Sequence, residues 1–220
     1  MENCVRFPHL LKSEILDGLD TDFKKNFLNA GVAKVYHKPT TIFDQGEPVS
    51  GMAIVAHGYV DISLVGEDGQ KTFLARANVG ESLGESETII GESCAANCKT
   101  SSNTTLLHCA VADVNAALKN PGFIKNITRI FHNRMMFDNW VKHITMFGSV
   151  SCRLRNYLYV LSESTGTVRE TQSYLANMVG CSRQTINREL GMLREAGLIA
   201  QSGSEIRVLD RAALGEGLVL

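Results

Sequence analysis

The chain has 220 residues, of which 44% are hydrophobic, and a formal net charge of −1. These values are ordinary for a globular protein with one or two domains. Residues 151–220 hold eight Lys or Arg and seven Asp or Glu, so binding to nucleic acid would depend on a local basic patch rather than on bulk charge. No apolar run approaches the roughly 18 residues of a membrane span, and the first residues lack the basic-then-apolar pattern of a signal peptide. We therefore expect no membrane partner, a cytoplasmic location and cysteines that are mostly free thiols.

Residues 1–30 carry apolar side chains at helical spacing. The pair Asp17-Gly18 interrupts this pattern. We expect two short helices that lead into a β domain.

From about residue 32 to residue 107 the pattern changes to short alternating runs that are punctuated by glycine. One such run is expected to place Val60, Ile62 and Leu64 on one face of a strand. Gly66–Gly69 is a strong signal for a hairpin turn after that strand. Strands of this length and spacing predict an antiparallel barrel or roll.

A long helix is predicted to begin at Pro121, because proline is well tolerated in the first turn of a helix. Apolar or bulky residues then follow a 3–4 alternation, interrupted by Arg134, at positions 127, 130, 134, 137, 141, 144 and 148. Such a seam is typical of a two-stranded coiled coil in a homodimer, although it also fits a helix that packs on its own domain. Gly148-Ser149 is expected to end this helix.

The segment Thr171–Leu190 predicts a helix-turn-helix. Thr171 and Ser182 are suitable N-caps, and Gly180 lies where a tight turn needs a permissive backbone. Behind Ser182, an inner stripe is formed at helical spacing by Ile186, Leu190 and Leu193. Residues 198–209 form two β-type runs around a Ser-Gly-Ser turn, which predicts a β-hairpin wing.

The outer face of the second helix is polar, with Arg183, Gln184, Asn187 and Arg188. Arginine can bind guanine with two hydrogen bonds in the major groove, and glutamine or asparagine can do the same with adenine. An ordinary amphipathic helix would also have a polar outer face. The glycine turn and the arginine-rich start of this helix favour binding to DNA.

The segment Gly180–Leu190 resembles the recognition segment of the catabolite-activator/fumarate-nitrate-reduction-regulator (CRP/FNR) superfamily of bacterial transcription regulators. The resemblance extends to Phe43–Glu47, Gly58 and Gly66–Gly69, which lie where that superfamily's β-roll has its turns. It implies an α+β fold with a cyclic-nucleotide-binding-type antiparallel β-roll, a long dimerisation helix and a winged helix-turn-helix. The expected domains are residues 1–120 for sensing, 121–148 for dimerisation and 149–220 for DNA binding.

The same resemblance implies a homodimer that binds a palindromic operator in double-stranded DNA and contacts RNA polymerase. Base contacts are expected from Arg183, Arg188 and the intervening Gln184. Contacts that position the protein on phosphates are expected from Thr171, Gln172, Ser173, Ser182 and Thr185.

In that superfamily the effector pocket follows a Gly-Glu pair, and an Arg-Ser pair about ten residues later holds the phosphate of a cyclic nucleotide. Here Gly84-Glu85 is present, but Cys94-Ala95 occupies the place of the Arg-Ser pair. A buried phosphodiester needs a charge-assisted partner, which cysteine and alanine cannot supply. Lys99 is the nearest cation along the chain and is expected on the opposite face.

Asp138 and Asn139 lie at helix positions where the superfamily often contacts its effector across the dimer, although they also fit an ordinary solvent-facing surface. Cys94 and Cys98 would be about 13 Å apart in an extended strand, so that only a bend would bring them together. They fit a thiol sensor, haem ligands or small buried hydrophobic residues.

The sequence therefore predicts a regulator with no enzymatic activity and an unidentified small-molecule or redox effector other than cyclic AMP, or no effector. No cofactor is assigned. The alternatives within this class are a cyclic-nucleotide-responsive activator with a different phosphate anchor and a haem or thiol redox sensor. A β-roll that binds a protein partner, with a vestigial helix-turn-helix, is a further alternative.

Overall fold

The structure is a computed structural model that describes residues 2–67, 69, 71–162, 166–203 and 205–216. The side chains of residues 140, 141, 143–145 and 147 also lie outside the description. The chain forms two compact units, Met1–His132 and Asn133–Leu220. None of the helices in the described ranges is long and apolar enough to cross a membrane.

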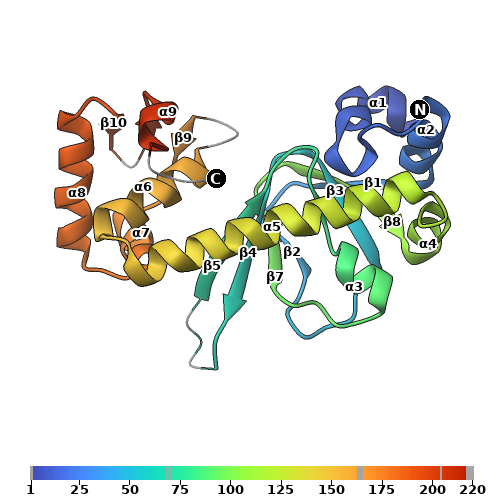
Figure 1. Ribbon diagram of the computed structural model, residues 1–220, viewed down its shortest axis with the longest axis horizontal. Coiled ribbons are helices and arrows are strands. Elements are labelled where there is room, and N and C mark those ends of the chain that lie inside the picture. The colour runs from blue at the N-terminus through green and yellow to red at the C-terminus, as the bar shows by residue number, and fades with distance from the viewer. Residues whose placement is uncertain (1, 68, 70, 163–165, 204, 217–220) are drawn as a thin grey trace. The chain divides into compact units, whose positions relative to one another are not determined.

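The strands of the first unit form two antiparallel sheets of four strands each within the described residues, in the orders β1-β8-β3-β6 and β2-β7-β4-β5. This arrangement confirms the predicted β-roll (Figure 1). The strands are β1 (Val32–Tyr36), β2 (Thr41–Phe43), β3 (Gly51–His57), β4 (Val60–Val65), β5 (Lys71–Ala77), β6 (Ser82–Leu83), β7 (Asn97–Thr100) and β8 (Thr104–Ala110).

Two hydrophobic clusters lie on opposite faces of the sheet that contains β3. Between the two sheets, Ala53 and Val55 of β3 pack in a cluster with side chains from both sheets, namely Tyr36, Phe43, Val60, Ala77, Leu83, Cys94, Cys98 and Leu106. On the other face, Met52 and Ile54 pack against the N-terminal helices, α4 and the beginning of α5. β3 is therefore buried on both faces, which is why it contains no alternation of apolar and polar residues.

The N-terminal segment differs from the two helices that its periodicity predicted. It contains α1 (Asn3–Arg6), the 3-10 helices η1 (Pro8–Lys12) and η2 (Glu14–Leu16), and α2 (Thr21–Ala30). Pro8 at the start of η1 cannot donate a hydrogen bond to continue α1. Asp20 begins α2 by accepting a hydrogen bond from the backbone N–H of Phe23 at 2.8 Å.

The buried face of β4 differs from the prediction at Leu64, next to a β-bulge in its pairing with β5. The register between β4 and β5 shifts between Ile62 and Ser63, which places Ser63 inside and leaves Leu64 37% exposed. The prediction that Val60, Ile62 and Leu64 share one buried face was therefore wrong for Leu64, which is exposed at the point where β5 has an extra residue, Leu74, in its pairing with β4. The predicted turn after β4 includes residue 68, which lies outside the described residues.

The long helix α5 (Pro121–Phe147) follows α3 (Glu85–Ile90) and α4 (Val111–Ala117). Its start at Pro121 and its end before Gly148-Ser149 confirm the prediction. The first two positions of the predicted coiled-coil seam are buried in the core of the first unit, where Ile127 and Ile130 pack with Phe123. The seam was therefore wrong at these two positions. Its later positions 141 and 144 have side chains outside the description.

The second unit has the elements of a winged helix-turn-helix. They are α6 (Val150–Leu161), β9 (Thr167–Val168), α7 (Gln172–Val179), α8 (Arg183–Glu195), β10 (Ile199–Ser202), β11 (Glu205–Val208) and α9 (Arg211–Leu214). The wing formed by β10 and β11 was predicted. β9, which pairs with the outer side of β11, and α9 were not predicted.

Candidate nucleic-acid interface and effector site

The turn between α7 and α8 is built by three local interactions. The side chain of Thr171 accepts a hydrogen bond from the backbone N–H of Tyr174 at 3.1 Å, and Ser182 accepts one from the N–H of Thr185 at 3.1 Å. Gly180 ends α7 in the left-handed conformation, with φ of 71°. The two caps satisfy backbone donors that a helix start leaves without partners. Both predicted caps and the predicted turn are confirmed.

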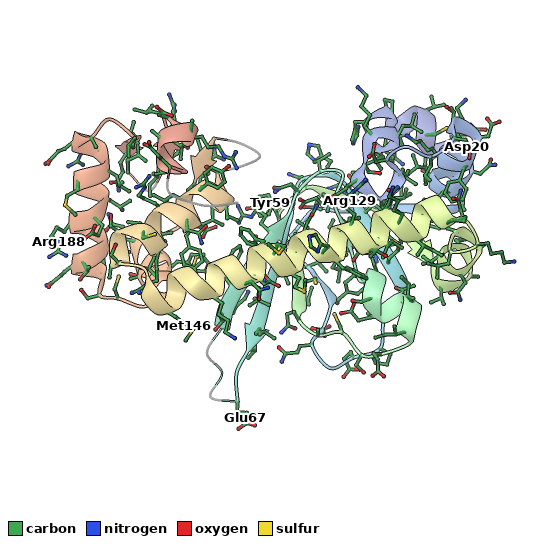
Figure 2. All side chains as sticks on the ribbon, viewed as in Figure 1. Asp20, Tyr59, Glu67, Arg129, Met146 and Arg188 are labelled. Carbon is green, nitrogen blue, oxygen red and sulfur yellow. The ribbon has the colours of Figure 1, made fainter. Side chains whose placement is uncertain are left out.

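α8 separates an apolar face from a polar one. Ile186, Leu190 and Leu193 are buried. The opposite side chains are exposed, and Figure 2 shows Arg188 on this helix. They are the residues predicted to face DNA, Arg183, Gln184, Asn187 and Arg188. The helix therefore presents one row of hydrogen-bonding side chains that can enter a major groove.

The hydroxyl-bearing residues around the turn can also donate hydrogen bonds outward. In the caps, Thr171 and Ser182 use an oxygen lone pair on a backbone N–H, so each keeps an O–H donor. The hydroxyls of Ser182 and Thr185 are 2.9 Å apart. Ser173 is exposed and Gln172 is half-buried at the start of α7. Such donors at helix N-termini suit phosphate oxygens.

Glu189 is a part of this site that the sequence interpretation missed. Its side chain is only 6% exposed, and its Oε1 accepts a hydrogen bond at 3.1 Å from the guanidinium of Arg188. Its Oε2 is buried and has no hydrogen-bond partner among the described residues. Glu189 therefore fixes one edge of Arg188 from inside the unit. An acidic residue three positions after Ile186, on the buried stripe, was the signal that could have identified it.

The effector site predicted from Gly84-Glu85 lies at the end of β6. Gly84 has φ of 76°, and a Cβ atom there would lie 3.1 Å from the ring of Phe43, so both the backbone and the packing favour glycine. Glu85 is 1% exposed. Its carboxylate accepts a hydrogen bond from the hydroxyl of Ser82. Ser82 was not singled out from the sequence, although the spacing Ser-x-x-Glu was visible.

The Cys94-Ala95 pair is divided between the core and the surface. Cys94 is buried in the cluster between the two sheets, whereas Ala95 is exposed. The backbone N–H of Ala95 donates to Glu87 Oε1 at 3.3 Å. A carboxylate thus occupies the neighbourhood where the resemblance would require a cation.

The nearest cations along the chain are engaged or lie elsewhere. Arg76 makes two hydrogen bonds, of 2.7 and 3.1 Å, to the carboxylate of Asp61, and its guanidinium lies 3.8 Å from the centre of the Tyr59 ring. Lys99 is exposed and lines a surface cavity with Tyr59 and Asp61. Its neighbour Cys98 is buried, so the two side chains lie on opposite faces of β7.

Cys94 and Cys98 do not lie in one extended strand, and the bend that would be needed to bring them together is present. β7 begins only at Asn97, and residues 95 and 96 form a bend. Both thiols point at the carbonyl oxygen of Ala96, with distances from Sγ of 3.0 Å for Cys94 and 3.9 Å for Cys98. The bend therefore brings together two sulfur atoms that an extended strand would separate.

Asp138 and Asn139 lie on the part of α5 that belongs to the second unit, and both are exposed. Partial burial raises the pKa of Asp138, and the nearby Arg134 partly offsets this effect. Among the described residues, no group of three or more His, Cys, Asp or Glu is arranged to hold a metal ion.

Both units match known domain families. Residues 33–120 match the cyclic nucleotide-binding domain family, and residues 152–216 match the Crp-like helix-turn-helix domain family. The chain belongs to the CRP/FNR superfamily of transcription regulators. Members of this superfamily regulate transcription and are not enzymes, as the sequence predicted.

Transcriptional regulators from other bacteria align with most of the chain. The chain is 26% identical over 189 residues to a CRP-like cAMP-activated global transcriptional regulator of Mycobacterium tuberculosis, with coverage of 79% of this chain and 82% of the relative. It is 24% identical over 190 residues to the cAMP-activated global transcriptional regulator CRP of Salmonella typhimurium, with coverage of 79% and 87%.

Two solved structures show the same fold. The c-di-GMP-responsive global regulator CLP of Xanthomonas campestris has a TM-score of 0.71 at 21% identity, with coverage of 87% of this chain and all of that chain. FixK2 of Bradyrhizobium japonicum also has a TM-score of 0.71, at 16% identity, with coverage of 84% and 96%.

Replacement of Glu189 by methionine is predicted to stabilise the second unit by about 1–3 kcal/mol, because it removes a buried carboxylate whose second oxygen is unsatisfied. Denaturant unfolding followed by circular dichroism measures this change. The matched control is Glu195→Met at an exposed position of the same helix, which should change stability by less than about 0.5 kcal/mol. A loss of stability in Glu189→Met would mean that the contact with Arg188 outweighs the cost of burying the carboxylate.

Proposed function

We propose that this CRP-like DNA-binding regulator acts as a homodimer on a palindromic operator, and that it responds to an effector other than cyclic AMP or to none. Sensing is assigned to residues 1–120, dimerisation to 121–148 and DNA binding to 149–220. The same proposal includes contact between the DNA-bound regulator and RNA polymerase.

The observation that carries the effector proposal is the chemistry at Cys94-Ala95. A phosphodiester carries a negative charge and needs a cationic partner when it is taken out of water. Here the group that reaches the backbone of Ala95 is the carboxylate of Glu87. An anionic cyclic nucleotide would therefore meet repulsion where it needs attraction.

Two alternatives keep specific support. The match to the cyclic nucleotide-binding family and the relatives described as cAMP-activated favour a cyclic-nucleotide-responsive activator that uses a different phosphate anchor. The paired thiols of Cys94 and Cys98 favour a thiol or haem sensor. Burial raises the pKa of both thiols, which keeps them protonated and slows thiol oxidation.

The homodimer is supported by apolar side chains on α5 that a single chain leaves open to water. Met135 and Met136 are 53% and 55% exposed, and Met146 is 65% exposed (Figure 2). Methionine is enriched in the cores of protein interfaces. A second copy of α5 would bury these side chains in an isologous contact.

The proposed DNA contacts follow from the exposed face of α8. Arg183, Gln184 and Arg188 would reach base edges, with Arg188 oriented by Glu189. Phosphates would be bound by residues around the turn, namely Thr171, Gln172, Ser173, Ser182 and Thr185. Two such helices in a dimer would read half-sites about one helical turn apart.

Arg183→Ala is predicted to weaken operator binding by about 1–3 kcal/mol and to flatten the preference at one base pair of the half-site. Arg194→Ala removes the same charge from an exposed position in the last turn of α8 and should leave that preference intact. Selection from a random DNA library, followed by affinity measurements on single-base variants, tests both. An equal loss on all sequences would contradict base reading by Arg183.

Calorimetry should detect no binding of cyclic AMP, cyclic GMP or cyclic di-GMP to the unaltered protein, because the phosphate site lacks a cation. The double variant Cys94→Arg with Ala95→Ser restores the pair that the superfamily uses and should gain measurable affinity for a cyclic nucleotide. Saturable binding of cyclic AMP by the unaltered protein would overturn the proposal and support the alternative anchor, and saturable binding of cyclic GMP or cyclic di-GMP would contradict the argument from the missing cation.

Replacing both Met135 and Met136 by glutamate is predicted to weaken the dimer by at least about tenfold, or about 1.4 kcal/mol, because a two-fold interface brings the new charges together. Sedimentation velocity over a concentration series measures this shift. Lys125→Glu, at an exposed position of α5 in the first unit, is the control and should remain dimeric. An unaltered chain that sediments as a monomer would refute the dimer.

A further inference from the structure

One carbonyl group brings two buried thiols together at the edge of the β-roll core. Cys94 and Cys98 are each 5% exposed, and both are free thiols. Their Sγ atoms lie 3.0 and 3.9 Å from the same oxygen, that of Ala96. The bend at residues 95–96 makes this possible. Two backbone hydrogen bonds of 2.8 Å anchor the start of the bend. In one, the Cys94 N–H donates to the Glu47 oxygen, and in the other the Gly46 N–H donates to the Cys94 oxygen.

The environment of this pair opposes a free thiolate. Burial raises the pKa of Cys98 to about 12, and repulsion from Cys94 is the next cause. Burial also raises the pKa of Cys94, and Glu87 adds to the effect. Thiols that stay protonated are poor nucleophiles toward peroxides and disulfides.

The surroundings favour the approach of a cation. Asp44 and Glu47 line a surface cavity of about 610 Å³ together with Gln45, Val65 and Asn97. Glu47 connects this cavity to the thiol pair, because its backbone oxygen accepts a hydrogen bond from the Cys94 N–H. A cavity lined by one sign of charge concentrates ions of the opposite sign.

We propose that Cys94 and Cys98 form a dithiolate site for a thiophilic d10 metal ion, such as Hg(II) or Cu(I), bound by the two sulfur atoms alone. Two metal–sulfur bonds form, two S–H bonds break, and both protons leave to solvent. The oxidation state of the metal does not change. Soft thiolate ligands select ions of this class.

The coordination number distinguishes this class from zinc. Structural zinc almost always takes four ligands, and the described residues contain no suitable group of three or more His, Cys, Asp or Glu. Linear two-coordinate binding needs only the two thiols. The complex with Hg(II) is neutral, whereas that with Cu(I) carries one negative charge, so burial near Glu85 and Glu87 should favour Hg(II).

The test uses the full chain with Cys152→Ser and Cys181→Ser, which removes the two half-buried thiols that would compete. Hg(II), Cu(I) and Zn(II) are titrated without oxygen and in the presence of a competing ligand. We expect one Hg(II) or Cu(I) ion per chain, tighter binding of Hg(II), a sulfur-to-metal charge-transfer band and two protons released. Zn(II) should not bind. Adding Cys94→Ser or Cys98→Ser should abolish the band, whereas adding Cys109→Ser, a buried thiol on the other face of the sheet, should preserve it.

A second measurement uses the unaltered chain and needs no folded variant. Alkylation of the folded chain with and without Hg(II), mapped by mass spectrometry, should show that the bound ion slows modification of Cys94 and Cys98 together and leaves the rate at Cys109 unchanged. Equal metal binding with and without these two thiols would overturn the proposal, as would Zn(II) binding at the same site. A Cys94–Cys98 disulfide that forms in air, with no metal bound to the reduced protein, would also overturn it. None of these measurements involves DNA, so their failure leaves the proposed function standing.

Discussion

Burial of β3 on both faces is the constraint on which the first unit depends. Ala53 and Val55 face the second sheet, while Met52 and Ile54 face the N-terminal helices, α4 and the beginning of α5. In a strand that is covered on both sides, a change in packing on one face is expected to displace side chains on the other, because protein interiors are close-packed and deform little. The β-roll interior and the first turns of α5 therefore belong to one continuous body, in which Ile127 is buried.

The same body creates an unusual chemistry at the place where relatives in the CRP/FNR superfamily are expected to hold a phosphate. The polar groups there are thiols and carboxylates, and the carboxylate of Glu85 is buried with a hydrogen bond from Ser82. The carboxylate of Glu87 opposes an anion, and the protonated thiols offer it no positive charge. The fold of a cyclic nucleotide-binding domain is thus retained while Cys94-Ala95 stands where the superfamily has an Arg-Ser pair, and function depends on the site rather than on the fold.

Much of the second unit could be predicted from the sequence because its shape depends on local constraints. Thr171 and Ser182 cap helices through hydrogen bonds to residues three positions later, and Gly180 adopts a backbone conformation that other residues rarely tolerate. The amphipathic stripe of α8 needs only the periodicity of one helix. The same reasoning placed the start of α5 at Pro121 and its end before Gly148. The base-reading roles of α8 remain predictions.

What the sequence by itself determined is therefore the set of elements and their local chemistry, including the absence of an Arg-Ser pair after Gly84-Glu85. The tertiary structure decided how residues distant from one another are combined. Ser63 is buried and Leu64 exposed beside a bulge in the pairing of β4 with β5, and a bend brought Cys94 and Cys98 to one carbonyl. The burial of Glu189 required the packing of neighbouring helices. Periodicity cannot predict such features, because each depends on partners supplied by other strands and helices rather than on the spacing within one element.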